Sequence, residues 1–366
     1  MSRGALELVC PAGTPSALRA AVRAGADTVY CGLRDETNAR NFPGLNFSPD
    51  ELADAVTQAH QGGARVMVAI NTFAQAGRVA IWHNAVDAAA QAGAHAVIAA
   101  DMAVLEHAAN RHPGLRLHLS VQAAAGTPEA IRFYAERFGV KRVVLPRILS
   151  IPEIKALTGE IDIEVEVFAF GGMCVMTEGR CDLSSYVTGR SPNLDGVCSP
   201  PEAVSYSRRG TSRSVALGGL TIDRQEDGEP LGYPTLCKGR FMAGGKTAHL
   251  FEDPVSLNTI DVLPHLLDAG VTALKIEGRQ RGKAYVEAVT RRFRQAIDAL
   301  GRPDSARRDC LRQARAADPG RHRQRRRTAR ARRQDGNLVD PDLTGQSSRA
   351  ASDRRAGGRW RACRAQ

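Results

Sequence analysis

The stretch LELVCPAGTPSALRAAVRAGA, residues 6–26, contains the unit from which most of the chain is built. Its apolar start, LELVC, predicts a buried β-strand that ends at Pro11. Thr14 then offers a helix cap, Pro15 suits the first helical position, and apolar residues follow at helical spacing. We therefore expect one strand followed directly by one helix.

The same pattern recurs along the first 300 residues. We predict eight strands, at 6–10, 28–33, 65–71, 95–101, 115–122, 141–146, 161–170 and 272–278. Helical segments alternate with them, and the helix before the last strand is predicted over 256–270. Such alternation forms a parallel sheet, either open and doubly wound or closed into a barrel. Eight units in about 300 residues favour the α/β class with a parallel (β/α)8 TIM-like barrel, over residues 5–300.

A barrel of this kind carries its active site at the carboxyl ends of the strands. Strand alternation turns Arg116, His118, Ser120 and Gln122 inward, and it does the same for Glu164, Glu166, Lys275 and Glu277. Inward polar residues form either a site or an internal salt-bridge network that fixes strand register. The catalytic candidates are Glu166, Lys275 and Glu277, and the substrate-binding candidates are Arg40, Gln122, Arg147 and Arg279. The alternative for each arginine is a structural role, bracing a loop through an acidic neighbour.

The segment between the seventh and eighth predicted strands is an insertion, residues 171–255, with four cysteines: Cys174, Cys181, Cys198 and Cys237. Four thiolates suffice for tetrahedral zinc or for a [4Fe–4S] cluster. Structural zinc sites typically use closely spaced cysteine pairs, whereas six, 16 and 38 residues separate these four. The spacing therefore favours iron–sulfur without excluding zinc. Cys10 and Cys31 lie in apolar strands, where we expect buried core residues.

The formal charge of +11 is confined to the end of the chain. Residues 301–366 hold 19 Arg, no Lys and 7 Asp, which leaves 31 basic and 32 acidic residues in residues 1–300. The near-neutral body does not favour binding to a nucleic-acid backbone, so no nucleic-acid partner is expected. The sequence shows no secretory signal and no apolar run of transmembrane length, so we expect a cytoplasmic protein without a membrane span.

Residues 301–366 contain only three Leu and one Val, and they lack Ile, Met, Phe and Tyr. Such a segment cannot bury enough apolar surface to offset its ordering entropy, so we expect a disordered tail. Its Arg-rich, Lys-free composition is also what a frame-shifted reading of a GC-rich gene would produce.

Three sequence motifs of enzymes are not supported. Gly245-Lys246-Thr247 resembles the end of a phosphate-binding loop, but Arg240 stands where that loop requires glycine. The sequence contains neither GxSxG nor HExxH, which argues against a standard serine hydrolase or zinc protease.

The segment from Glu166 to Ser184 resembles the defining motif of the collagenase-like peptidase family U-32. The matching residues are Glu166, Phe168, Gly171, Cys174, Gly179, Cys181 and Ser184, while Gly172 stands where Ser or Ala is commoner. Within the family, residues 32–47, 121–134, 221–241 and 256–281 resemble the members that serve in oxygen-independent ubiquinone biosynthesis.

This resemblance implies a [4Fe–4S] cluster on the four cysteines and hydroxylation of the ubiquinone ring without dioxygen. It also implies a heterodimer with a paralogous V subunit, with prephenate as the hydroxyl donor and a quinone precursor as the acceptor. Three other functions stay open: RNA-base hydroxylation as in other family members, peptide hydrolysis, and a non-catalytic scaffold for a hydroxylase.

Overall fold

A computed structural model of the chain describes residues 6–174, 176, 181–195, 197–229, 231–232, 234–251 and 256–301. The expectations for residues 302–366 and for Gly179 therefore lie outside the described residues. Eight parallel strands form a closed barrel: β1 (Glu7–Pro11), β2 (Thr28–Gly32), β3 (Arg65–Ile70), β4 (Ala96–Ala99), β5 (Arg116–Leu119), β6 (Arg142–Val144), β7 (Glu164–Gly172) and β14 (Ala273–Ile276). Pairing runs in chain order from β1 to β7, and β14 lies between β7 and β1 and closes the ring. The predicted parallel barrel is confirmed.

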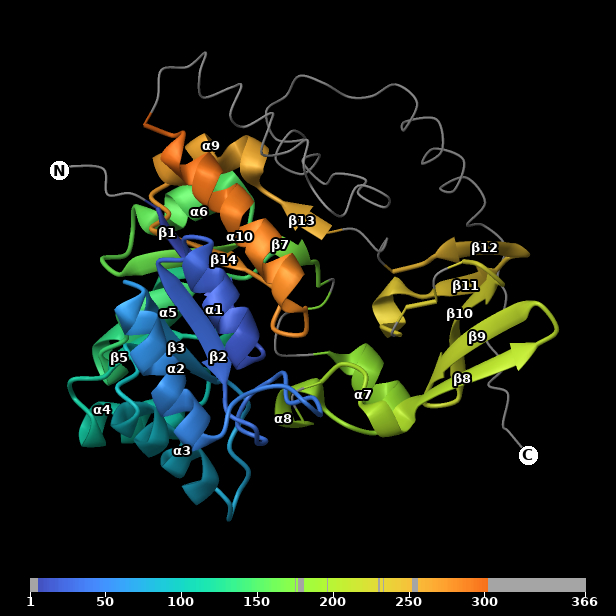
Figure 1. Cartoon of the computed structure of the whole chain (residues 1–366), viewed down its shortest axis with the longest axis horizontal. Coiled ribbons are helices and arrows are strands. Elements are labelled where there is room, and N and C mark those ends of the chain that lie inside the picture. Colours follow the sequence, from blue (N-terminus) through green and yellow to red (C-terminus); the bar gives the residue numbers. More distant parts are fainter. Residues whose placement is uncertain are drawn as a thin grey trace. The chain divides into compact units, whose positions relative to one another are not determined.

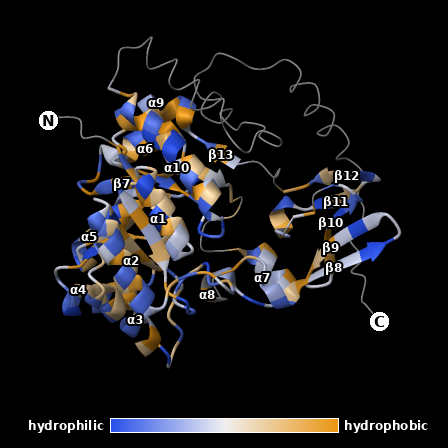
Figure 2. Cartoon of the chain, viewed as in Figure 1, coloured by the Kyte–Doolittle hydropathy of each residue, from blue (hydrophilic) through white to orange (hydrophobic). Residues whose placement is uncertain are grey.

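Helices alternate with the strands and flank the barrel (Figure 1). They are α1 (Pro15–Arg23), α2 (Pro49–Gln61), α3 (Ala80–Gln91), α4 (Met102–Arg111), α5 (Pro128–Phe138), α6 (Ile151–Thr158), α9 (Leu263–Asp268) and α10 (Lys283–Asp298). Thr14 caps α1 by accepting a hydrogen bond from the Ala17 amide, and Pro15 opens that helix as the sequence predicts. Figure 2 shows hydrophobic and hydrophilic residues along α1 and α10, as expected for helices with one face on the barrel.

Strand alternation divides the apolar residues into two layers. The larger core lies between strands and helices and includes Leu117 and Leu119 of β5. A smaller cluster fills the barrel interior with residues from five strands: Val9, Tyr30, Met67, Ala96, Ile98 and Ala273. The interior cluster holds few large side chains, which leaves space for a layer of charged residues.

That charged layer is centred on Arg142 of β6. Its guanidinium lies 2.5 Å from Glu7, 2.6 Å from Glu164 and 3.2 Å from Glu166. Burial raises the pKa of Glu7, but the interactions with Arg142, Thr28 and Arg65 together outweigh burial and hold this pKa below its ordinary value. Every carboxylate of the network therefore has a cationic partner, as buried charges require.

The segment between β7 and β14 forms small elements of its own. They are α7 (Asp182–Thr188), α8 (Pro192–Asp195), an antiparallel sheet of β8 (Val204–Arg209), β9 (Ser212–Leu217) and β10 (Leu220–Glu226), and a hairpin of β11 (Arg240–Ala243) and β12 (Lys246–His249). Val215, Leu217, Ile222 and Leu236 form their separate small core. The end of β8 is hydrophilic in Figure 2, in keeping with its exposed residues.

Two predicted boundaries need correction. β7 continues through Gly171 and Gly172, which the sequence analysis placed in the insertion. The helix predicted over 256–270 is wrong at its start, because β13 (Ser256–Asn258) pairs antiparallel with the end of β7. A short 3-10 turn (Ile260–Val262) then leads into α9. None of the described helices combines the length and apolarity that a membrane crossing needs.

Candidate functional site

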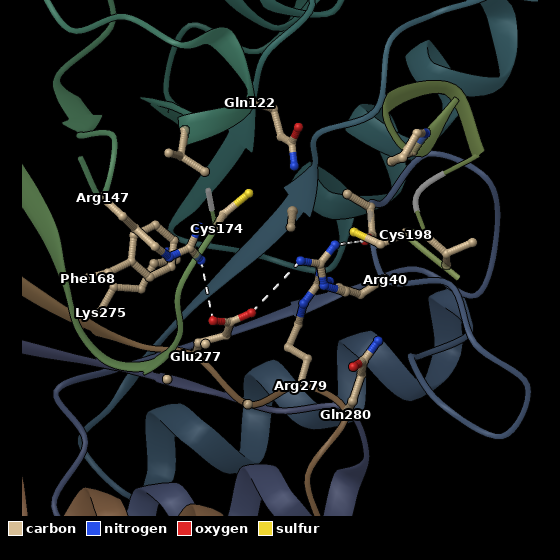
Figure 3. Close-up of a pocket in the computed structure, with 18 of the residues that line it drawn as sticks. Arg40, Gln122, Arg147, Phe168, Cys174, Cys198, Lys275, Glu277, Arg279 and Gln280 are labelled. Atoms are coloured by element: carbon tan, nitrogen blue, oxygen red, sulfur yellow. Dashed lines mark hydrogen bonds and ion pairs between the residues drawn. The ribbon is translucent and has the colours of Figure 1, made fainter. Parts of the chain in front are cut away.

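A pocket of about 370 Å³ opens at the carboxyl ends of the barrel strands (Figure 3). The loops after the strands and the cysteine-bearing insertion both contribute to its wall. Ten residues predicted as catalytic, substrate-binding or metal-binding line it together: Arg40, Gln122, Arg147, Cys174, Cys181, Cys198, Cys237, Lys275, Glu277 and Arg279. The remaining candidate, Glu166, lies deeper and is 0% exposed.

Glu277 lies at the centre of the charged wall, directly after β14. Its amide donates a hydrogen bond to the Phe170 carbonyl, which fixes the backbone against β7. One oxygen of its carboxylate lies 3.4 Å from Arg147 Nη2, and the other oxygen lies 3.8 Å from Arg40 Nη2 (Figure 3). One half-buried carboxylate thus holds two cations that follow different strands.

Arg147 is held in place by Phe168 of β7 as well as by Glu277. Its guanidinium carbon lies 3.6 Å from the centre of the Phe168 ring, and its side chain is 8% exposed. Stacking on an aromatic face suits the planar guanidinium and orients its donors. The motif phenylalanine therefore positions a pocket cation.

Arg279 is the most deeply buried of the three arginines. Its Nη1 donates a hydrogen bond to Asn38 Oδ1 at 3.1 Å, and burial lowers its pKa to about 10, which leaves it charged at neutral pH. A Cβ on Gly32 would lie 2.6 Å from Arg279 Nη1, so glycine at the end of β2 makes room for this side chain.

Lys275 forms the floor of the pocket. Its Nζ lies 2.5 Å from Glu166 Oε1 and 4.1 Å from the centre of the Tyr30 ring. Burial lowers the pKa of Lys275, while the Glu166 carboxylate opposes that effect. Glu166 thus contacts the pocket only through Lys275. The Lys275–Glu166 pair belongs both to the predicted internal salt-bridge network and to the predicted site.

The strand predicted over 115–122 ends at Leu119, and Gln122 lies beyond it in a 3-10 turn (Val121–Ala123) capped by Ser120. Its side chain points into the pocket in Figure 3. Its Oε1 is buried and accepts no hydrogen bond from the described part of the chain. A buried amide oxygen without a partner is costly, so a bound donor is the natural partner for this atom.

Tyr30 is a pocket residue that was not among those predicted from the sequence. This residue lies on the inward face of β2 beneath the pocket, and its hydroxyl donates to the Ile276 carbonyl at 2.9 Å. Both Lys275 and Arg279 lie near its ring. Along the strand TVYCG, alternation turns Tyr30 to the opposite side from Val29 and Cys31. This alternation is the sequence signal that could have identified Tyr30 as an inward-facing residue.

The four insertion cysteines are partly exposed and line this one pocket. Burial raises the pKa of Cys237 to about 12, and the charges of the other three thiolates add to that effect. Burial also raises the pKa of Cys198, with Arg40 opposing it. A cationic metal centre would lower these raised pKa values, because coordination stabilises the thiolate form of cysteine. Cys10 and Cys31, by contrast, are fully buried in the core, as predicted.

The donor set fits a centre that takes four thiolates. Within the described residues, no three of these sulfurs lie within 4.8 Å of one another. Four sulfurs around one zinc ion, at about 2.3 Å from it, would be about 3.8 Å apart. The sulfurs are therefore spread more widely than a single zinc ion requires.

The chain is thus a closed (β/α)8 barrel whose pocket, lined by charged residues and cysteines, lies where barrels of this class carry active sites. Comparison with family models identifies the particular family. The model of peptidase family U32 matches residues 13–327, and the chain belongs to this family.

Three relatives of this chain carry names that refer to different activities. The chain is 32% identical over 295 residues to tRNA hydroxylation protein P1 of Bacillus subtilis, which covers 80% of this chain and 63% of that protein. It is 30% identical over 304 residues to a collagenase of Porphyromonas gingivalis, with 80% and 66% covered. It is 30% identical over 298 residues to a 23S rRNA 5-hydroxycytidine synthase of Escherichia coli, with 81% and 40% covered. The chain thus spans less than two thirds of the length of these relatives.

Proposed function

We propose that this chain is a hydroxylation enzyme subunit that holds a [4Fe–4S] cluster on Cys174, Cys181, Cys198 and Cys237. The observation that carries the proposal is that these cysteines line the same pocket as Glu277 and the strand-end arginines. A cluster held there would supply one-electron redox chemistry next to a polar binding site. The names of relatives such as tRNA hydroxylation protein P1 support hydroxylation as the reaction class.

The residues of the barrel would bind and orient the substrate. Arg40 and Arg147 share the Glu277 carboxylate, so an anionic substrate group would compete with Glu277 for these guanidinium groups. Glu277 released in this way could accept a proton or a hydrogen bond from the substrate. Lys275, whose pKa is lowered by burial, is the candidate proton donor at the pocket floor.

The more specific proposal is hydroxylation of the ubiquinone ring without dioxygen, together with a paralogous V subunit and with prephenate as the hydroxyl donor. It rests on the resemblance of residues 221–241 and 256–281 to members in that pathway. A dicarboxylate donor suits a pocket with three arginines. The near-neutral body of the chain favours a small molecule over a nucleic acid.

RNA-base hydroxylation is the second candidate, because relatives at 29–32% identity carry tRNA or rRNA hydroxylation in their names. Arg208 and Arg213 of the insertion pair with Asp227, and Arg240 pairs with Asp223, so part of the positive charge of the insertion is already neutralised. This pairing favours the quinone proposal.

The test is complementation under anaerobic conditions. A host that lacks its own members of this family receives the gene, and quinone intermediates and modified nucleosides are both measured. Restored ubiquinone would support the quinone proposal, whereas restored hydroxylated nucleosides alone would replace it with the RNA proposal. Peptide turnover by the purified protein, with neither product restored, would contradict both.

A further inference from the structure

A cluster of histidines joins helices α3 and α4, on the outside of the barrel. Asp87 of α3 lies against His107 of α4 and against His112, the residue that follows α4. The Asp87 Oδ1 is 2.8 Å from His107 Nε2 and 2.6 Å from His112 Nε2. These three atoms lie within 4.8 Å of one another, and none of the three residues lines the barrel pocket.

A fourth residue orients the cluster. His83, one turn before Asp87 on α3, stacks on His107 with ring centres 4.0 Å apart and ring planes 6° apart. His107 is therefore held between a ring on one face and a carboxylate at its Nε2 edge.

We propose that Asp87, His107 and His112 form a site for zinc, or for another divalent transition metal of similar ligand preference, that ties α3 to α4. Two imidazole nitrogens and one carboxylate oxygen are a common zinc ligand set, and three protein ligands leave a position for water. Because the ligands come from two helices, bound metal would cross-link helices that otherwise meet through side-chain packing.

Small side-chain movements would admit the ion. Ligand atoms about 2.1 Å from a tetrahedral zinc lie about 3.4 Å apart, so the Asp87 contacts must open by about 0.6 to 0.8 Å. The side chains of His107, His112 and Asp87 are 15%, 25% and 35% exposed, which leaves them room to rotate and gives the ion an entry path. Binding requires each histidine to carry its proton on Nδ1, leaving Nε2 free as the ligand.

Cobalt(II) is the probe that separates this site from the cysteines. Thiolate ligands give intense sulfur-to-cobalt absorption, whereas histidine and carboxylate ligands give only weak bands in the visible. Titration of the anaerobically purified full chain should show weak bands that saturate at one equivalent and are lost when zinc is added; they are measured as difference spectra against the same chain before cobalt, because a bound iron–sulfur cluster also absorbs in the visible. Zinc alone should raise the melting temperature, because it binds only the folded site.

Variants locate the ion. His107→Gln and His112→Gln should each weaken cobalt binding at least tenfold, and Asp87→Asn should act similarly. His60→Gln, at an exposed position of α2, is the matched control and should bind as the unchanged protein does. The melting temperature without metal is measured for every variant, which reveals any folding defect in Asp87→Asn. If Asp87→Asn has such a defect, the two histidine variants decide whether the site binds the ion.

Unchanged affinity in both histidine variants would overturn the proposal. So would absorption dominated by sulfur-to-cobalt bands with no weaker component. The outcome is independent of the proposed hydroxylation function, since the two sites share no residue.

Discussion

Gly171, at the end of β7, lies so close to Glu277 that a Cβ built on it would stand 2.4 Å from the Glu277 Cβ. Its φ of 130° is also one that residues with side chains rarely adopt. Glycine at this motif position thus allows the end of β7 to lie directly beside Glu277, the central carboxylate of the pocket. The next glycine, Gly172, would meet Glu277 only at 3.4 Å and has no such backbone constraint.

Gly171→Ala should therefore displace Glu277 and reduce activity, at a cost of about 1–3 kcal/mol in stability. Gly172→Ala is the matched control and should change both quantities much less. Activity, iron content and urea unfolding are measured on both variants. Equal behaviour of the two variants would show that the close approach at Gly171 does not position Glu277.

Arg40→Ala and Arg147→Ala should each lower anaerobic product formation at least tenfold while leaving iron content intact. The reason is that charge-assisted hydrogen bonds to a substrate anion contribute about 1.5–3 kcal/mol each. Arg78→Ala removes an exposed arginine paired with Glu36 and serves as the control. Full activity in both pocket variants would exclude an anionic binding pocket, and lost iron would show that the arginines support the metal centre instead.

Single substitutions of Cys174, Cys181, Cys198 or Cys237 by alanine should each reduce iron and sulfide in the anaerobically purified protein. Cys31→Ala, in the core and away from the pocket, should keep both. We expect about four irons and four sulfides in the unchanged chain, as a [4Fe–4S] cluster requires. Zinc in place of iron, or full iron in the Cys198 and Cys237 variants, would contradict the assignment of four cluster ligands.

Stability should fall in acid because of the Arg142 network. The folded-state pKa values of Glu7 and Glu164 are lowered: burial opposes this shift, but the interactions with Arg142 and with their other hydrogen-bond and basic partners together outweigh burial. The unfolded chain therefore takes up protons first as the pH drops. The stabilisation from these groups is present above their ordinary value of 4.5 and is lost as the pH falls below it, through the lowered values.

Arg142→Met should destabilise the fold by about 3–5 kcal/mol at neutral pH, because it removes the cation that Glu7, Glu164 and Glu166 share and leaves each of them with a single basic partner. Arg116→Met removes a more exposed partner of Glu164 and should cost under about 1 kcal/mol. Urea unfolding at several pH values measures both. A similar loss of stability in the two variants would show that Arg142 does not stabilise the fold through the charged layer.

The sequence alone was sufficient to predict the barrel. Alternation along strands, helix caps such as Thr14 and the order of elements are local properties, and each is encoded within a stretch of a few residues. The confinement of four cysteines to one insertion is equally local, so a common role for them could be proposed without coordinates.

The tertiary structure decided which side chains meet. Arg40 and Glu277 are more than 200 residues apart, and their contact follows from barrel closure and from the close packing of β7 on β14. The same holds for Tyr30 beneath Lys275 and for Asp87 between His107 and His112, since each contact joins different elements. No local pattern records such contacts, because the distance between side chains on separate elements depends on how the whole chain packs.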